Sequence, residues 1–452
     1  MTTPKPHLDL WSGIGLVAAN MIGAGVFLSA GYMAQTMSAG WILIDWVFGM
    51  ALAMAGARAY AEVARLVPRS GGEYRYLSEL VHPSLGYLAG WGSLFIGFAA
   101  PIAINAVGAA AFLGTVLDIP DPRLVASLFL LALTAMHGVN LAASKVTQNA
   151  LIALKVALLI GFVGLGLLLG DNRWPEWVPP TGSTAFHAGD FFGNMFWIAF
   201  AFSGWNAAIY AASEFKNPAR DVPRAMLIGC AAVGVLYLLV NWVFVANLTP
   251  SDASIVFEDR PVTLGHALIV KLVGSTAADV MSIFIALAFL SAMSAMTMVG
   301  PRVYAAMAED GFLPRVLAAR EGRPPFGSTL FQSAVALAII WTHSLRHALD
   351  SVGALLVLFS ALTCCSLFAM RLRRDLPNPR PIALVCAVAY VGLSTWVLVY
   401  GLKNRISTTL LVGVGAVLAA ATVAYLVTEQ LRRRRSAAGG SSGRGPGSPS
   451  RW

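Results

Sequence analysis

Two short stretches place residues whose backbone can bind charged groups inside apolar segments. The first, NMIGAGVF at residues 20–27, puts Gly23, Ala24 and Gly25 in a run long enough to cross a membrane. Glycine disfavours a helix by roughly 1 kcal/mol relative to alanine, so we expect the helix to break there. At such a break the amides that start the second half can bind an anion, and the carbonyls that end the first half can bind a cation. An amino-acid zwitterion carries both charges.

The second stretch lies in the apolar segment at residues 191–214, where Ser203, Gly204, Trp205 and Asn206 interrupt the run. On the first stretch alone, close helix packing through small residues explains the glycines equally well. The second stretch favours the binding interpretation, because paired interruptions at corresponding positions of two repeats are typical of a transporter site. Non-helical backbone at membrane depth also requires surrounding protein or a water-filled cavity.

The segments that would position these stretches are predicted to be membrane helices. Of the 452 residues, 57% are hydrophobic and 12% are charged, whereas soluble domains carry about 25% charged residues. Apolar runs of about 20 residues recur along the chain. The pattern predicts twelve spans, at residues 10–35, 41–62, 84–117, 124–141, 148–170, 191–214, 224–247, 276–301, 327–344, 348–370, 381–400 and 406–430.

The distribution of charge predicts orientation and domain organisation. The net charge is +9, and the segments on one side, with the adjoining span ends, hold 23 of the 31 lysine and arginine residues. The positive-inside rule therefore predicts a multi-pass cell-membrane protein with both termini in the cytoplasm. We expect residues 1–430 to form a single domain, followed at 431–452 by a basic and then Gly/Ser-rich disordered tail. The arginines at 432–435 suit lipid headgroups of the bilayer better than nucleic acid.

The remaining reactive side chains form no catalytic pattern. An enzyme would need His, Asp, Glu or Ser side chains that converge within the spans, and an ion channel would show filter loops or rings of charge. A membrane sensor that binds without transport stays open, although no added regulatory domain is visible. The sequence indicates no disulfide and no metal site, because all the cysteines lie in apolar segments: Cys230, Cys364, Cys365 and Cys386. No cofactor is expected either.

Four motifs resemble the amino acid–polyamine–organocation (APC) transporter superfamily, over residues 10 to about 430. They read NMIGAGVF, YAEVARLVPRSGGEYRYL, FAFSGWNAAIYAASEFKNPARDVPRA and GPRVYAAMAEDGFLP. The resemblance implies an all-α, LeuT-like fold with two inverted repeats of five helices, broken first and sixth helices, and two further C-terminal helices. It also implies a secondary active transporter that works by alternating access.

The sixth span is most similar to L-type and related cationic amino-acid transporters. The resemblance implies an aromatic gate at Phe200 and a carboxylate-binding turn at Gly23, Ala24 and Gly25, where Ala24 lacks the hydroxyl that a serine would add. The expected substrate-binding set is Ile22, Gly23, Ala24, Gly25, Phe200, Ala201, Ser203, Gly204 and Asn206.

Lys155 falls deep inside the predicted span at residues 148–170. Snorkelling to the interface is the simplest interpretation, although an ionisable group at this depth is also a functional candidate. The resemblance favours a coupling role, because in sodium-independent members of the superfamily a lysine here replaces a sodium ion and ties the first helix to the eighth. Ser291 and Ser294 share one face of the eighth span and complete the expected coupling group. Hydroxyl bonds back to their own helix are the alternative.

The acidic residues near the spans have simpler explanations. Asp45 is expected in water near the outer interface. Three glutamates lie at helix ends or in loops: Glu62, Glu73 and Glu214. Each is expected to pair with a basic residue, namely Arg65, Arg69 or Lys216.

We therefore expect a sodium-independent amino-acid transporter that exchanges substrates or couples to protons. A neutral substrate is favoured because residues 20–27 and 200–210 contain no carboxylate for a cationic side chain. A cationic amino-acid or polyamine exchanger and an amino-acid exporter stay open. The sequence indicates no partner subunit.

Overall fold

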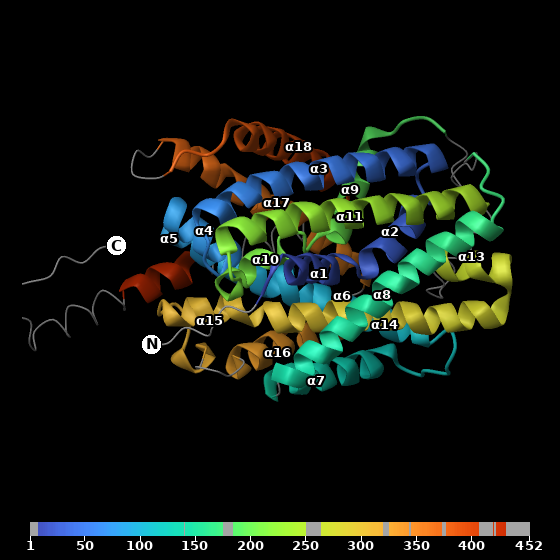
Figure 1. The fold of residues 1–452 in the computed structure, drawn as a ribbon, viewed down its shortest axis with the longest axis horizontal. Helices are drawn as coiled ribbons and strands as arrows, with labels where there is room; N and C mark the ends of the chain where they lie inside the picture. Colours follow the sequence, from blue (N-terminus) through green and yellow to red (C-terminus); the bar gives the residue numbers. More distant parts are fainter. Residues whose placement is uncertain are drawn as a thin grey trace, which may run out of the picture.

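A computed structural model describes residues 8–139, 141–174, 184–249, 264–319, 325–342, 345–372, 377–405, 419 and 422–430. Within these residues the fold is a bundle of long helices that run roughly along one direction (Figure 1). The start of α1 (Leu10–Met21) lies toward the same end of the bundle as α4 (Gly72–Leu80) and α15 (Pro301–Glu309). That end is called the α4 end below.

The elements follow the predicted order of apolar segments. The first half of the chain forms α1, α2 (Ala24–Met33), α3 (Ala39–Leu66), α4, α5 (Pro83–Gly92), the π-helix η1 (Ser93–Ala99), α6 (Ala100–Leu113), α7 (Pro122–Val139) and α8 (Leu141–Leu169). The second half forms α9 (Ala188–Phe202), α10 (Ala207–Tyr210), η2 (Ala212–Glu214), α11 (Pro218–Asn247), α13 (Leu264–Val273), α14 (Ser275–Val299), α15, η4 (Arg315–Leu317), α16 (Phe326–Thr342), α17 (Leu345–Leu372) and α18 (Pro381–Arg405).

The predicted spans correspond to these helices as far as the chain is described. Eight helical stretches among the described residues are long and apolar enough to cross a membrane, and two shorter apolar helices lie at 122–138 and 326–342. Each of the first eleven predicted spans coincides with a helix or a broken helix. The twelfth, at 406–430, and the tail at 431–452 fall largely outside the described residues, so the count of twelve stays a prediction.

Local sequence signals explain where several helices begin. Asp9 caps α1, because its carboxylate accepts a hydrogen bond from the Ser12 amide at 2.9 Å. Proline opens α11 at Pro218, where a missing amide hydrogen does no harm. The π-helix η1 ends just before Pro101, which cannot donate the hydrogen bond that a regular α-helix requires there. The helix therefore has wider, π-helical turns at residues 93–99, beside the site described below.

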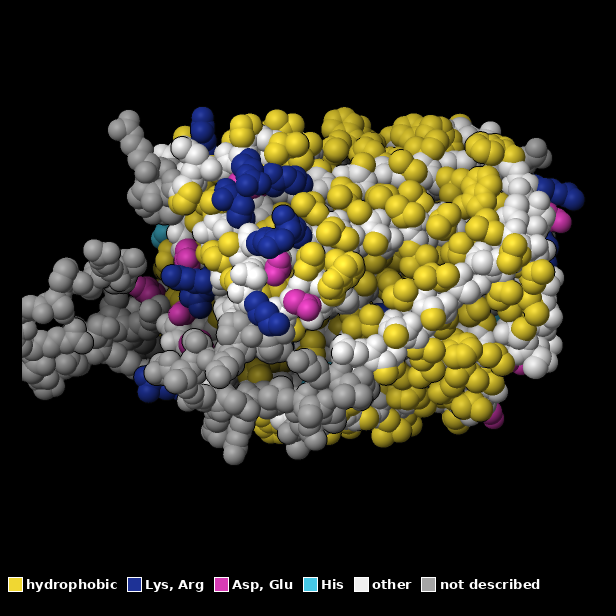
Figure 2. Space-filling view, viewed as in Figure 1, with side chains coloured by type: hydrophobic (Ala, Val, Ile, Leu, Met, Phe, Trp, Pro, Cys, Tyr) yellow, Lys and Arg dark blue, Asp and Glu magenta, His cyan; other side chains and the backbone are white. Residues whose placement is uncertain are grey.

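The broken helix α1–α2 lies at the centre of the bundle. In its most apolar 18-residue window 82% of the residues are buried, against 28% for α18 at the periphery. A central helix is apolar all round because it contacts protein on every side, whereas α18 keeps one face outward. Figure 2 shows hydrophobic side chains over most of the visible flank, with Lys and Arg gathered toward the α4 end. This pattern fits a flank in lipid and a charged end in water.

Candidate functional site

The first predicted break is present between α1 and α2. Ile22 and Gly23 have extended backbone, so the helix stops at Met21 and restarts at Ala24. The ammonium of Lys155, on α8, donates hydrogen bonds to the carbonyl oxygens of Ala19 at 2.7 Å and Ile22 at 2.6 Å. Carbonyls that have lost their helical partners are thereby satisfied by a cation.

The second break separates α9 from α10 at residues 203–206. Gly204 has a φ of +99°, a conformation that L side chains rarely adopt and that glycine allows freely. The Ser203 amide and hydroxyl both donate to the Phe200 carbonyl, at 3.0 Å and 2.6 Å. The serine therefore closes the end of α9 and lets the chain turn.

Two glycines bring the broken helices into direct contact. A Cβ atom on Gly25 would lie 2.4 Å from the Cα atom of Ala201, and one on Gly204 would lie 2.8 Å from the carbonyl carbon of Asn20. No larger residue fits at either place without moving backbone. Close packing and helix breaking, which the sequence presents as alternatives, therefore both operate here.

Tyr237 on α11 joins the two breaks. Its hydroxyl lies 2.7 Å from the carbonyl oxygen of Met21 and 3.1 Å from that of Ala201, so one buried donor serves the ends of both α1 and α9. Sequence reasoning missed this residue. The only signal was a tyrosine within an apolar run, which most often packs with a single local partner.

Two cavities meet at the second break, and they share the lining residues Ser203, Gly204, Asn206, Leu356 and Ser360. The first, called the Glu73 cavity, has about 580 Å³ of space between atoms, part of which is open solvent, and is also lined by Asn20, Glu73, Ser93, Phe98, Tyr210 and Met296. The second, called the Trp205 cavity, has about 500 Å³ of such space, again including open solvent, and is also lined by Ala53, Met195, Ile198, Phe202, Trp205 and Tyr390.

The expected substrate-binding residues divide into two groups. Ser203, Gly204 and Asn206 line both cavities. The linings do not include Ile22, Gly23, Gly25, Phe200 or Ala201, and the side chain of Ala24 lies outside the described residues. The reason is the contact between Gly25 and Ala201, which places the end of α9 directly over the start of α2.

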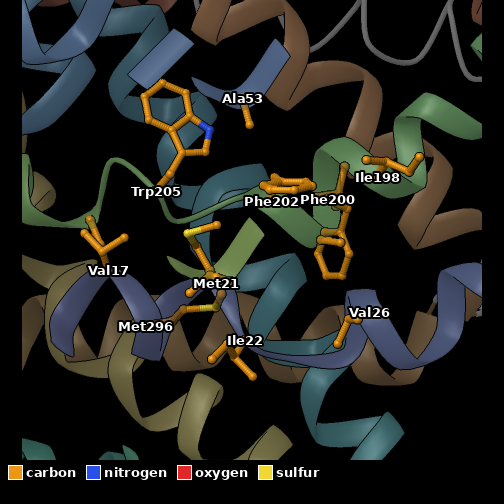
Figure 3. Packing of buried hydrophobic residues seen from close by; sticks show 14 of the residues in the cluster. Val17, Met21, Ile22, Val26, Ala53, Ile198, Phe200, Phe202, Trp205 and Met296 are labelled. Atoms are coloured by element: carbon orange, nitrogen blue, oxygen red, sulfur yellow. The ribbon is translucent and has the colours of Figure 1, made fainter. Parts of the chain in front are cut away.

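Phe200 lies between the two broken helices. Figure 3 shows its ring pointing from α9 toward α2 near Val26, while the Trp205 indole points the other way, toward Ala53 on α3. The Phe200 side chain is buried. It therefore occupies the half of the break that lies away from the Glu73 cavity, and its role as a gate stays a prediction.

Glu73 contradicts the expectation of an arginine or lysine partner. Its carboxylate accepts hydrogen bonds from Asn206 Nδ2 at 2.5 Å, Tyr210 Oη at 2.7 Å and Tyr60 Oη at 3.2 Å. None of the ion pairs formed by the described residues includes it. Burial raises the pKa of this carboxyl, and the hydrogen bonds from Tyr210, Asn206 and Tyr60 oppose the rise.

This geometry also corrects the argument for a neutral substrate. That argument required the binding region to contain no carboxylate, yet Glu73 lines a cavity together with Asn206 and Ser203. The sequence could not place it there, because α4 lies outside the spans and Asn206 is 133 residues away along the chain.

The other acidic residues differ in how well they match expectation. Glu62 contacts Arg65 at 2.7 Å, as predicted, and also Arg58 at 3.2 Å. Glu214 pairs with Arg302 at 2.5 Å rather than with Lys216. Asp45 was expected in water, which is wrong: its relative exposure is 0%.

The coupling group is only partly assembled around Lys155. Lys155 is buried and contacts α1, so it does not snorkel. Ser294 faces elsewhere: its hydroxyl donates to Gln148 Oε1 at 2.6 Å and lies 2.8 Å from His137 Nε2. The Ser291 hydroxyl is buried without a hydrogen-bond partner among the described residues.

Comparisons with known proteins extend over nearly the whole chain. Residues 8–429 match the sequence profile of the family described as amino acid permease. The large neutral amino acids transporter small subunit 2 of Homo sapiens is 27% identical over 424 residues, covering 89% of this chain and 76% of that protein. The b(0,+)-type amino acid transporter 1 of Mus musculus is 26% identical over 411 residues, covering 88% and 82%. The Asc-type amino acid transporter 1 of Homo sapiens is 26% identical over 428 residues, covering 92% and 80%.

Proposed function

Because the chain belongs to the amino acid permease family and is a transporter rather than an enzyme, we propose that it moves amino acids by alternating access, independently of sodium. The observation that carries the proposal is the pair of helix breaks in contact, which Tyr237 holds through the carbonyls of Met21 and Ala201. Backbone exposed in this way at the centre of a bundle is where transporters bind small charged substrates.

The proposed architecture is LeuT-like. Spans one to five and six to ten would form two inverted repeats, so that the breaks in α1–α2 and α9–α10 occupy equivalent positions. Two further helices would complete a single domain over residues 1–430, and the tail at 431–452 would be cytoplasmic. The gathering of Lys and Arg at the α4 end supports a cytoplasmic location for that end in the cell membrane (Figure 2).

The substrate carboxylate would bind the amides at the start of α2, around Gly23, Ala24 and Gly25. Those amides have no partners within the helix, and a helix N-terminus favours an anion. In the conformation described, Ala201 covers Gly25. Binding would therefore require α9 to move relative to α2, with Phe200 moving with it, and such a movement is the gating step that we propose.

Neutral amino acids are the proposed first substrates. The Trp205 cavity beside the break is lined by apolar side chains such as Ala53, Ile198 and Phe202, which suit an apolar substrate side chain. A relative named as a transporter of large neutral amino acids supports the same class. Exchange, export and proton coupling remain alternatives for the direction and energy source of transport.

Sodium independence rests on Lys155. Its ammonium occupies the cation position at the end of α1, where it contacts the carbonyl oxygens of Ala19 and Ile22. A metal ion there would have to displace a covalently tethered charge. Lys155 is thus the proposed substitute for sodium, and also a group through which a proton could enter the cycle.

A partner subunit also becomes a proposal, which revises the sequence-based expectation. One relative is named as a small subunit, that is, as one component of a larger transporter. Isolation of this chain from its native membrane under mild detergent, followed by identification of any stoichiometric second chain, tests whether the same holds here.

Uptake into proteoliposomes that contain the purified chain tests the function. We expect accumulation of a radiolabelled neutral amino acid, or its exchange for internal substrate, with equal rates in sodium and choline buffers. Binding of the amino acid without any uptake or exchange would instead identify a sensor.

A further inference from the structure

We propose that Glu73 forms a cation subsite of the substrate cavity, which receives the ammonium or guanidinium group of a cationic amino-acid side chain. The inference rests on the proposed function and extends its substrate class: neutral and cationic amino acids would share one site. Both classes of substrate would bind their α-amino and α-carboxylate groups at the helix breaks. The Glu73 cavity would distinguish a cationic side chain from a neutral one.

The first argument is the set of donors around the carboxylate. Asn206, Tyr210 and Tyr60 each donate one hydrogen bond to Glu73, at 2.5 to 3.2 Å. All three are neutral groups. The backbone amide of Glu73 is a further neutral donor, so the carboxylate, which borders the cavity, is surrounded by hydrogen-bond donors that carry no positive charge.

The second argument is that nearby arginines are already paired. Arg75 contacts Asp310 at 2.9 Å, Arg69 contacts Glu79 at 3.3 Å, and Arg302 contacts Glu214 at 2.5 Å. These three arginines each have a carboxylate partner, whereas Glu73 is buried and forms no ion pair among the described residues. Burying a carboxylate without a counter-charge is strongly unfavourable. A cationic ligand would supply the missing counter-charge and so lower the free-energy cost of burial.

The third argument is the position of Glu73 relative to the breaks. The same cavity is lined by Asn20, three residues before Gly23, and by Ser203 and Asn206 at the second break. A substrate whose α-amino and α-carboxylate groups bind at the breaks could extend a long side chain along the cavity to Glu73. Apart from Glu73 and the weakly acidic Tyr210, the cavity lining contains no ionisable side chain.

Competition between lysine and norleucine tests the inference. Norleucine has the same unbranched four-carbon side chain as lysine but lacks the ammonium group. In the proteoliposome assay with a labelled neutral amino acid, both should compete for uptake by the unchanged protein. Glu73→Gln keeps the size and removes the charge. It should weaken competition by lysine about ten- to hundredfold, the loss expected for a charge-assisted hydrogen bond, and leave norleucine within about twofold.

Glu79→Gln is the matched control. Glu79 lies on the same helix, is partly exposed and pairs with Arg69 and Arg75. Its substitution should leave both competitors unchanged. An equal weakening of lysine and norleucine in Glu73→Gln would show that Glu73 only supports the structure, and would overturn the subsite.

Two outcomes separate this inference from the proposed function. If the unchanged protein transports no amino acid, the proposed function fails. If it transports neutral amino acids but lysine does not compete, only the cation subsite is overturned.

A pH series shows whether Glu73 receives a proton instead. The titratable groups around it are phenols: Tyr60 on α3, Tyr210 on α10, Tyr76 on α4 itself and Tyr390 on α18. Glu73 is the only carboxyl among these groups and burial raises its pKa, so it is the first of them to take up a proton as the pH falls. Protonation at lower pH should weaken lysine competition and spare norleucine. Acid stimulation of neutral uptake that disappears in Glu73→Gln, without lysine competition at any pH, would overturn the cation subsite in favour of a proton site.

Discussion

Single residues at the two breaks illustrate what residue type can and cannot predict. Gly23, Ala24 and Gly25 indicate a break because glycine is a poor helix former, and the chain does leave the helix at Ile22 and Gly23. Glu73 could not be assigned in the same way. Its environment depends on Asn206 and Tyr210, which are 133 and 137 residues away. Local patterns cannot specify contacts at that separation.

Gly25 provides a test of close packing at the break. Gly25→Ala adds a Cβ atom 2.4 Å from the Cα atom of Ala201, so α2 and α9 must separate. Overpacking of this kind lowers the free energy of unfolding by roughly 1–3 kcal/mol. Thermal unfolding of the purified variant measures the loss. Gly25→Val, which adds two further methyl groups at the same contact, should be less stable still.

The control for Gly25 lies on the other half of the same broken helix. A Cβ atom on Gly15 in α1 meets nothing within 4 Å. Gly15→Ala should therefore leave the unfolding temperature unchanged or slightly raised, because alanine favours a helix. Similar destabilisation of both variants would reject the packing explanation.

Tyr237 provides a test of the link between the breaks. Tyr237→Phe keeps the ring, which packs edge-on against Trp46 and Phe202, and removes the hydroxyl that serves Met21 and Ala201. Two buried carbonyls lose a donor, which should lower stability by roughly 1–3 kcal/mol. Uptake per folded molecule should also fall, because the relative position of the breaks is no longer fixed. Normal uptake by a stable phenylalanine variant would show that the link is dispensable.

Among the elements, the long apolar helices are the most predictable and the short ones the least. Eleven spans follow from hydropathy because a helix in lipid must satisfy its own backbone and expose apolar side chains. Helix α10 falls within the predicted span at residues 191–214, but the short helices α4 and α15, which lie at the α4 end, were not predicted. They are stabilised by tertiary contacts such as that of Tyr74 with Asp310 at 2.6 Å, 236 residues apart. The candidate site depends on one of them, α4, which carries Glu73.

Movement of α9 over α2 is tested at Phe200. If the ring closes the site, Phe200→Ala should bind substrate weakly yet lose uptake, because the occluded state no longer excludes water. Phe200→Trp and Phe200→Tyr, which keep a large planar ring, should retain part of the activity. Binding and uptake measured on the same purified variants distinguish these effects.

Phe192 is a suitable control for Phe200, because it lies on α9 but contacts Trp396 and Tyr400 on α18 instead of α2. Phe192→Ala should change stability more than uptake per folded molecule. The gate is rejected if Phe200→Ala behaves like Phe192→Ala, with reduced stability and near-normal uptake.

For the whole molecule, composition and the order of motifs determine the family and the membrane location, but not the substrate or the energy source. The charge bias predicts orientation because it sums over many loops, and no single misplaced arginine reverses it. Substrate class instead depends on one or two side chains in a cavity, and the cation subsite proposed above gives this role to Glu73 rather than to a residue of either break.

The energy source is tested at Lys155. If its ammonium replaces a sodium ion at the carbonyls of Ala19 and Ile22, then uptake should be indifferent to exchange of sodium for choline. Lys155→Met keeps much of the length but leaves both carbonyls without a cation. Hydrogen bonds to charged groups contribute roughly 1.5–3 kcal/mol each, so uptake should fall at least about tenfold.

Lys271→Met is the control for the loss of a lysine-to-carbonyl hydrogen bond as such, because the Lys271 side chain is exposed. Lys271 donates to the carbonyl of Asn247, at the end of α11, at 2.9 Å, and it lies on α13, which is at the opposite end of the bundle from α4. Its substitution should leave uptake near normal. Sodium-stimulated uptake by the unchanged protein would exclude Lys155 as a replacement for sodium. Recovery of uptake in Lys155→Met on addition of sodium would support it most directly, because the ion would then occupy the position that the ammonium has left.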